Sequence, residues 1–314
     1  MERHRALIER HLVRWAEALP QDDLYAPMAY LVLQPAKRVR PALVLLACEL
    51  FGGRAEDVLD EAVGIELFHN FSLMHDDIMD RAPLRRGLPT VHEKWNANTA
   101  ILSGDALLVK AYQAMGTNGE VLSLFSRYAL EVCEGQQWDM AFEQRTEVSE
   151  AEYLRMIRAK TAVLLSCALQ IGAMRAGAGV EDRMRIGAFG EHLGLAFQLR
   201  DDLLDAFGDP DRTGKQQGGD LRAGKKTLLL IRGLRAEKES GPSVLQEELA
   251  KLPAERDVRR MLQALRSVDV EESIAATIRA EEAKAITALD AIAVEDERKA
   301  ALRALASALM DRTH

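Results

Sequence analysis

Apolar residues recur at helical spacing along almost the whole chain of 314 residues. Spacings of three and four residues place such side chains on one face of an α-helix, where a neighbouring helix can bury them. The composition favours the same fold class, because Ala, Leu, Arg and Glu dominate and aromatic residues make up only 5%. Hydrophobic residues make up 48%, which is enough for a large core. The sequence therefore predicts an all-α helical bundle.

Proline and glycine residues divide this pattern into segments. We expect helices over residues 5–19, 41–50, 56–80, 93–115, 120–146, 149–176 and 181–207, with further charged helices after residue 227. Residues 21–39 contain Pro27 and Pro35 and are expected to form a connector. Residues 208–226 contain five glycines and a proline, which indicates a long polar loop of the kind that is often functional. Because neither period-2 strands nor a linker is evident, we expect one domain spanning residues 1–314.

Charge and cysteine content narrow the class of protein. The formal net charge of −8 would repel a polyanion, so we do not expect nucleic-acid binding. The three cysteines are widely spaced in apolar surroundings, which is typical of buried free thiols in a reducing compartment. The first twenty residues lack the apolar core of a secretory signal, and the longest apolar run, residues 42–48, is too short to span a bilayer. We expect a cytoplasmic protein without a membrane anchor.

Two acidic clusters interrupt the apolar pattern. DDIMD at residues 76–80 recurs as DDLLD at residues 201–205, at an interval of 201 − 76 = 125 residues. On a helix, Asp76 and Asp80 share one face, as do Asp201 and Asp205, and like charges at this spacing repel each other. A solvated acidic face is one interpretation. However, each cluster ends an apolar segment, so its carboxylates should face partners or a cavity.

Hard divalent cations suit this arrangement, because Mg²⁺ binds through a few carboxylates together with water and phosphate oxygens. Two such clusters facing each other could hold a diphosphate through bridging metal ions. Basic residues, which can bind phosphate directly, flank both clusters. They are Lys37, Arg38, Arg40, Arg85, Arg86, Lys160, Lys215, Lys225 and Lys226.

With these residues, the chain resembles the trans-isoprenyl diphosphate synthases of the polyprenyl synthetase family. The stretches that carry the resemblance are KRVRP (37–41), HDDIMDRAPLRRGLPTVH (75–92), AKTAVL (159–164), LAFQLRDDLLDAFGDPDRTGK (195–215) and DLRAGKKT (220–227). They occur in the family's order and span most of the chain. The resemblance implies an all-helical isoprenoid synthase fold around a central cavity, and a homodimer with one active site per subunit. It also implies head-to-tail condensation of isopentenyl diphosphate with dimethylallyl, geranyl or farnesyl diphosphate.

The resemblance also implies a role for each matching residue. It implies that Asp76, Asp80 and Asp201 bind about three Mg²⁺ ions, or Mn²⁺ ions in their place. Asp77, Asp202 and Asp205 would support these ligands. The allylic diphosphate would be held by Arg85, Lys160, Lys215 and Lys225, and isopentenyl diphosphate by Lys37, Arg40, His69 and Arg86. The allylic carbocation would face Thr161, Phe197 and Gln198. Gln136 and Asp139 match a further family pattern, although a polar cluster within a helix explains them equally well.

Two departures from the family pattern stand out. The family usually has Gly-Gly before the first basic cluster, whereas this chain has Pro35-Ala36, which puts close backbone approach of a diphosphate in doubt. Leu229 replaces a usual proline and would alter only the start of a helix.

The residues before the first cluster bear on product length. Phe71 followed by the small Ser72 resembles synthases that make the twenty-carbon geranylgeranyl diphosphate, although Phe71 could be ordinary core and Phe68 could set the floor instead.

Other functions remain alternatives. A farnesyl diphosphate synthase would differ only in the length of its product. A class I terpene cyclase usually pairs one DDxxD cluster with an Asn/Ser/Glu metal motif, which we do not find after Gly194. A regulatory synthase subunit typically lacks one acidic cluster, and both are intact here. The calcium loop of an EF-hand is absent as well.

Overall fold

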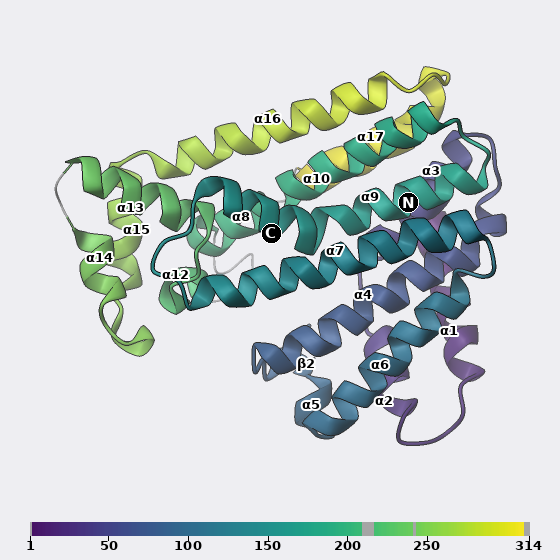
Figure 1. Cartoon of the computed structure of the whole chain (residues 1–314), viewed down its shortest axis with the longest axis horizontal. Coiled ribbons are helices and arrows are strands. Elements are labelled where there is room, and N and C mark those ends of the chain that lie inside the picture. The colour runs from purple at the N-terminus through teal and green to yellow at the C-terminus, as the bar shows by residue number, and fades with distance from the viewer. Residues whose placement is uncertain (1, 209–216, 241–242, 311–314) are drawn as a thin grey trace. The chain divides into compact units, whose positions relative to one another are not determined.

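The structure is a computed structural model that describes residues 2–208, 217–240 and 243–310. These residues are mostly helical, so the prediction of an all-α fold is confirmed (Figure 1). The α-helices are α1 (Glu2–Glu17), α2 (Ala26–Val32), α3 (Val39–Leu50), α4 (Leu59–Met79), α5 (Val91–Lys94), α6 (Ala97–Ala114), α7 (Gly119–Glu143), α8 (Glu150–Ile157), α9 (Val163–Arg175), α10 (Val180–Phe207), α12 (Gly219–Ala223), α13 (Leu228–Ser240), α14 (Val244–Leu249), α15 (Val258–Ser267), α16 (Val270–Asp290) and α17 (Asp296–Met310). The short elements are the 3₁₀ turns η1 (Ala55–Val58) and η3 (Pro253–Glu255), the π-helical turn η2 (Arg158–Ala162), and the antiparallel strands β1 (Leu84–Arg85) and β2 (Leu88–Pro89).

The chain forms two compact units, each built from separate stretches of sequence. Unit 1 comprises Met1–Ala129, Cys167–Gly187 and Ala293–Leu302, and unit 2 comprises Leu130–Ser166, Ala188–Ile292 and Arg303–His314. The first acidic cluster belongs to unit 1, and the second belongs to unit 2. That residues 1–314 make up a single domain stays a prediction.

Helix α4 is the core element of unit 1. Its side chains are buried almost all round from Leu59 to Phe71, as expected for an apolar helix without a polar face. Helix α6 lies beside it (Figure 1). Two glycines allow this close contact, because a Cβ atom on Gly104 would lie 2.2 Å from His75 Nε2 and one on Gly64 would lie 2.7 Å from Met115 Cε. The end of α4 that carries the acids is thereby fixed against α6.

Arg38 connects α1, α4 and the segment before α3 within unit 1. Its side chain is buried and donates to Glu66 Oε1 at 2.6 Å and to Glu9 Oε1 at 2.9 Å. It also donates to the main-chain carbonyls of Val32 and Gln34, at 2.6 and 3.1 Å. The charge of the buried Glu66 is thus compensated, and the segment before α3 is held against α4 and α1.

Unit 2 has a core of its own around α8, α10, α13, α15 and α16. Helix α15 packs into this core through one apolar face. The buried residues of that face follow helical spacing and are Val258, Met261, Leu262 and Leu265. Helix α8 begins with a capping box, in which the Ser149 hydroxyl accepts from the Glu152 amide and the Glu152 carboxylate accepts from the Ser149 amide.

Four local predictions are wrong, and the helix expected over residues 149–176 is interrupted by the π-helical turn η2. Residues 21–39 contain helix α2, which tolerates Pro27 because the residue lies in its first turn, where a missing N–H leaves no hydrogen bond unmade. A short hairpin forms at β1 and β2 through Arg86 and Gly87, whose φ angles of 54° and 77° suit a two-residue turn. The polar segment 208–226 contains helix α12 within its described part. Cys133 is exposed, whereas Cys48 and Cys167 are buried as expected.

One described helical stretch, Glu150–Arg175, is long and apolar enough to cross a membrane by length and composition alone. Of its most apolar window, 83% is buried inside the structure. The core helices of soluble proteins share these properties, so the stretch is weak evidence for a membrane span.

Removing the charge of Arg38 should destabilise the protein strongly. We expect Arg38→Met to lower the free energy of unfolding by about 3–5 kcal/mol, because it leaves Glu66 charged and buried without its partner. Denaturant unfolding measures the change. Arg3→Met is the control and should have little effect, since Arg3 is 66% exposed and solvent screens its ion pair with Glu56. Equal effects of the two substitutions would contradict this assignment.

Candidate active site

The first acidic cluster lies at the C-terminal end of α4 in unit 1. Asp76 is half-buried, Asp77 is buried and Asp80 is exposed. Asp80 caps the helix, and its amide donates to the Asp76 carbonyl at 2.8 Å. The apolar body of α4 thus ends in two carboxylates, Asp76 and Asp80, that lie one turn apart on the same face.

Asp77 is engaged by the hairpin that follows. Arg85 Nε is 2.9 Å from both carboxylate oxygens of Asp77, and Arg85 Nη2 is 2.7 Å from Oδ1. This fork geometry neutralises the buried carboxylate and fixes the hairpin against α4. The hairpin is closed further by Thr90, whose hydroxyl donates to the Ala82 carbonyl at 2.7 Å. Arg85, predicted to hold the allylic diphosphate, therefore contacts an acid predicted to support the metal ions, while the neighbouring Arg86 is exposed.

The basic segment before α3 separates into residues with different environments. Lys37 is exposed, and Arg40 is half-buried with its Nη1 atom 3.1 Å from His69 Nε2. Burial and the nearby arginines, Arg40 first among them, hold the pKa of His69 well below its usual range. His69 is therefore neutral, and its Nε2 atom accepts from Arg40. The structure thus brings together two residues predicted to bind isopentenyl diphosphate.

The sequence did not reveal that Arg38, which lies between Lys37 and Arg40, has a structural role. KRVRP presents three cations without any local signal that one is buried, and only the distant Glu9 and Glu66 distinguish Arg38. Its φ of 51° is in the left-handed region, which is unusual for a residue other than glycine. The ion pairs hold the backbone in this conformation directly before the helix that carries Arg40.

In unit 2, the second acidic cluster lies near the end of α10. Asp201 is exposed, Asp202 is 5% exposed and Asp205 is half-buried. The Tyr153 hydroxyl donates to Asp202 Oδ2, and Gln198 Nε2 donates to Asp202 Oδ1 at 3.0 Å. Burial raises the pKa of Asp202 to about 7, although both of these hydrogen bonds favour the charged form. Burial also raises the pKa of Tyr153, so that its hydroxyl stays protonated as the donor.

These contacts extend to a residue predicted to face the carbocation. The Thr161 hydroxyl donates to Gln198 Oε1 at 3.0 Å, so Thr161, Gln198, Asp202 and Tyr153 form one hydrogen-bonded chain. A hydroxyl has a single proton, and Thr161 uses it in this hydrogen bond. The Thr161 oxygen can therefore interact with other groups only through its lone pairs. Phe197, also predicted at the carbocation, is half-buried on α10.

Lys160 lies in the π-helical turn η2. Its Nζ atom is 2.6 Å from Asp139 Oδ2 on α7. This ion pair gives Asp139 a partner, whereas Gln136 is half-buried one turn earlier on the same helix. Turns of π-helix are rare and often occur at functional sites.

Asp205 fixes the described end of the polar loop. Its Oδ2 atom accepts from the Asp220 amide at 2.9 Å, and its main-chain carbonyl accepts from the Gly218 amide at 2.7 Å. Lys225 follows α12 and is half-buried, with its amide donating to the Asp220 carbonyl at 2.9 Å. Lys215, which was also predicted to hold the allylic diphosphate, lies outside the described residues.

A column of aromatic rings leads away from the first acidic cluster within unit 1. The ring of Phe71 is 4.9 Å from that of His75 and 5.5 Å from that of Phe68, between centroids. Phe68 in turn is 5.4 Å from Phe125 in an edge-to-face arrangement. Phe71 is 9% exposed, whereas Phe68 and Phe125 are fully buried. Ser72 is half-buried beside Phe71.

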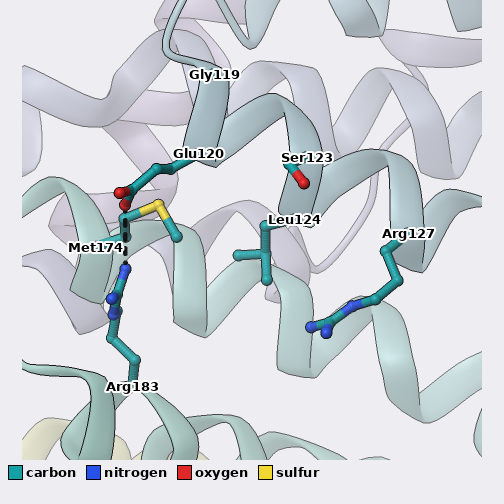
Figure 2. A pocket seen from close by; sticks show the side chains of 7 residues that line it. All are labelled: Gly119, Glu120, Ser123, Leu124, Arg127, Met174 and Arg183. Atoms are coloured by element: carbon teal, nitrogen blue, oxygen red, sulfur yellow. Dashed lines mark hydrogen bonds and ion pairs between the residues drawn. The ribbon is translucent and has the colours of Figure 1, made fainter.

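A separate hollow of about 450 Å³ also lies in unit 1, and Figure 2 shows it. Residues from α7, α9 and α10 line it: Gly119, Glu120, Ser123, Leu124, Arg127, Met174 and Arg183. Glu120 and Arg183 form an ion pair of 3.4 Å at one side (Figure 2). Its lining residues differ from all of those that the sequence assigned to the site.

The acidic clusters suit a hard cation by the chemistry of their donors. Among the residues that the structure describes, no three acidic, histidine or cysteine side chains come close enough together to hold a metal ion by themselves. Each cluster offers two carboxylates one turn apart, Asp76 with Asp80 and Asp201 with Asp205. Such oxygen donors bind Mg²⁺ together with water and phosphate oxygens. These residues therefore fit a magnesium ion that is shared with a diphosphate.

Comparison with known proteins decides the family. Residues 21–265 match the family model described as polyprenyl synthetase. The chain belongs to the polyprenyl synthetase family. It is 44% identical to a geranylgeranyl diphosphate synthase of Methanosarcina mazei over 217 residues, which cover 67% of each chain. It is 38% identical to a geranylfarnesyl diphosphate synthase of Aeropyrum pernix over 266 residues, or 81% of this chain and 82% of that protein. A crystal structure of a geranylgeranyl pyrophosphate synthase superposes with a TM-score of 0.94 at 39% identity, covering 99% of this chain and 98% of that one.

Membership of the polyprenyl synthetase family confirms the predicted enzyme class, which is trans-prenyltransferase. Members of the family use isoprenyl diphosphates as substrates and a divalent metal ion for catalysis. The terpene-cyclase and regulatory-subunit alternatives are not favoured. The roles assigned to individual residues stay predictions.

Proposed function

We propose that this polyprenyl synthetase condenses isopentenyl diphosphate head-to-tail with allylic diphosphates, and that its main product is geranylgeranyl diphosphate. The observation that carries the proposal is that both acidic clusters combine a pair of carboxylates with a nearby cation. Each pair lies at the C-terminal end of a helix, and the cation is Arg85 in unit 1 and Lys225 in unit 2. Similarity to geranylgeranyl diphosphate synthases supports the choice of product.

In this reaction the C–O bond of the allylic diphosphate breaks and inorganic diphosphate leaves with the bonding electron pair, the double bond of isopentenyl diphosphate attacks the remaining allylic cation, and a proton is then lost. We assign binding of the divalent metal ions, Mg²⁺ or Mn²⁺ and about three per site, to Asp76, Asp80 and Asp201. When bound, the metal ions supply positive charge to the departing diphosphate. Arg85, Lys160, Lys215 and Lys225 would bind the same diphosphate, and the released group would accept the proton.

The cation needs partners that do not react with it. The Thr161 hydroxyl donates its proton to Gln198, so its oxygen lone pairs can face positive charge. Gln198 is oriented by Asp202, whose two oxygens accept from Gln198 and Tyr153. We therefore assign Asp202 to positioning of this amide rather than to direct metal binding. Lys37, Arg40, His69 and Arg86 would hold isopentenyl diphosphate.

The metal assignment predicts loss of activity from either cluster. We expect Asp76→Ala and Asp201→Ala each to lower turnover by at least about a thousandfold, because each removes a metal ligand needed as diphosphate leaves. Purified protein is assayed with Mg²⁺, isopentenyl diphosphate and allylic primers of five, ten and fifteen carbons, and the dephosphorylated products are sized by chromatography.

Circular dichroism of each variant is the folding control. Near-normal turnover of a folded variant would refute its metal role. An inactive wild-type protein that is folded would refute the proposed reaction for every primer tested.

We further propose that Phe71 forms the floor that limits chain length. The growing tail would run from the carboxylates along α4, where Phe71 is slightly exposed while Phe68 behind it is fully buried. The small Ser72 beside it would let the tail pass further than a second aromatic would. Because relatives at similar identity include both twenty- and twenty-five-carbon synthases, side chains at this depth, rather than overall similarity, should set the length.

Removing this floor should lengthen the product. We expect Phe71→Ala to shift the main product from twenty carbons to twenty-five or more, since it opens space beneath the tail. Product sizing with farnesyl diphosphate as primer measures the shift. Phe142→Ala is the control, because Phe142 is a buried aromatic in the core of unit 2. An unchanged product distribution in Phe71→Ala would exclude Phe71 as the floor.

We propose that the enzyme is a cytoplasmic homodimer that associates through α6. This helix exposes Ile101, Leu102 and Val109, which are 42%, 60% and 56% exposed. Leu102 and Val109 lie seven residues apart and so share one face of the helix. An exposed apolar row of this kind is typical of a protein–protein contact.

Charges on this row should separate the subunits. We expect the double substitution Leu102→Glu and Val109→Glu to shift the protein from dimer to monomer in sedimentation velocity, because the interface would bury two unpaired carboxylates. Leu252→Glu is the control, since Leu252 is 68% exposed outside α6. A wild-type protein that sediments as a monomer, or a double variant that remains dimeric, would contradict the proposal.

A further inference from the structure

The π-helical turn η2 is the feature that the proposed chemistry leaves unexplained. It carries Lys160 and Thr161, and the Val163 amide donates back five residues to the Arg158 carbonyl instead of four. Conversion of such a turn to α-helix would rotate its side chains by about 100° relative to the helix that follows. Because π-turns are intrinsically rare, the surrounding structure must hold this one in place.

Two glycines show that neighbouring helices contact the backbone of this turn directly. A Cβ atom on Gly135 of α7 would lie 2.3 Å from Lys160 N and 2.7 Å from the Ala159 carbonyl carbon. One on Gly194 of α10 would lie 2.5 Å from Ala162 Cα. Real Cβ atoms do not approach backbone this closely, so glycine is required at both positions unless the turn moves. All of these residues belong to unit 2.

Arg158, the first residue of the turn, is bonded to the same two helices. Its Nε atom donates to Glu191 Oε1 of α10 at 2.7 Å, and its Nη1 atom donates to Glu131 Oε2 of α7 at 2.9 Å. Glu131 lies four residues before Gly135, and Glu191 lies three residues before Gly194. Each helix therefore contacts the turn twice, once by a carboxylate and once by a glycine.

We propose that Arg158, bridging Glu131 and Glu191, is a positioning residue that keeps η2 in its π-helical register and thereby presents Lys160 and Thr161 to the allylic diphosphate. This inference rests on the proposed function for the roles of the two presented residues. Arg158 itself touches no reacting atom. The contacts that depend on the register are Lys160 with Asp139, at 2.6 Å, and Thr161 with Gln198, at 3.0 Å.

The test compares Arg158→Met with Arg175→Met. Arg175 is a matched control, because its side chain is also 36% exposed and it forms an ion pair of 2.8 Å with Glu61, but in unit 1. We expect Arg158→Met to lower kcat/KM for the allylic diphosphate by about 10- to 100-fold, since small displacements of positioned groups have effects of this size. Arg175→Met should change kcat/KM by less than about twofold, although it should lower the denaturation midpoint at least as much as Arg158→Met, because its partner Glu61 is buried while Glu131 and Glu191 are half-buried.

A second readout reports the turn itself and does not require activity. Hydrogen exchange of the peptides that cover residues 155–165 should become faster in Arg158→Met and stay unchanged in Arg175→Met. Arg158→Lys should restore activity only in part, because an ammonium group is a point charge and cannot fork between two carboxylates. Glu131→Gln is the milder variant if Arg158→Met does not fold, and it should show the same two effects with smaller size.

The glycines supply a further matched pair on one helix. Gly135→Ala should lower kcat/KM and increase exchange at η2, whereas Gly119→Ala should do neither, since nothing lies within 4 Å of a Cβ atom at Gly119. Normal exchange at η2 and kcat/KM within twofold of the Arg175→Met value would overturn the proposal. An inactive wild-type enzyme would refute the proposed function alone, because hydrogen exchange would still test whether Arg158 holds the turn.

Discussion

Carboxylates that lose contact with water need a partner, and this constraint shapes the surroundings of both acidic clusters. Asp77 is neutralised by the Arg85 fork, and this contact fixes the hairpin against α4. Asp202 is stabilised by donors from Tyr153 and Gln198, and this contact fixes the amide that Thr161 meets. Of the acids that are not buried, Asp76, Asp80 and Asp201 are the ones assigned to metal ions, and Asp205, which accepts from the Asp220 amide, would support them. Burial thus divides each run of aspartates into positioning residues and candidate ligands.

The same constraint operates away from the clusters. Glu66 is buried in α4, and Arg38 compensates its charge while holding the main chain that precedes α3. In unit 2, Arg158 joins Glu131 and Glu191 across the π-turn. In both places an arginine with several donors connects segments that are distant in sequence, and the connected segments carry residues predicted to bind diphosphate. Arginine suits this task because its planar fork can reach two acceptors at fixed angles.

How far the site could be predicted depends on the range of the interactions. Helices α1, α4, α7 and α10 follow from apolar spacing, because periodicity is a local property. The helix α2 and the hairpin were missed, since a proline in a first turn and a two-residue turn through Arg86 and Gly87 depend on the local backbone conformation rather than on the spacing of apolar residues. The split of 149–176 by a π-turn was also missed. It depends on glycines of two other helices, which the sequence of the turn does not reveal.

The sequence by itself determined the fold class, the family and the candidate ligands, because helical periodicity and the spacing within DDIMD and DDLLD are encoded along the chain. Only the tertiary structure decided which member of each charged run does what. Arg38 could not be separated from Lys37 and Arg40, nor Asp202 from Asp201, until their burial and their partners were known. The physical reason is that the state of a charged side chain depends on desolvation and on groups far away in sequence, neither of which a local motif contains.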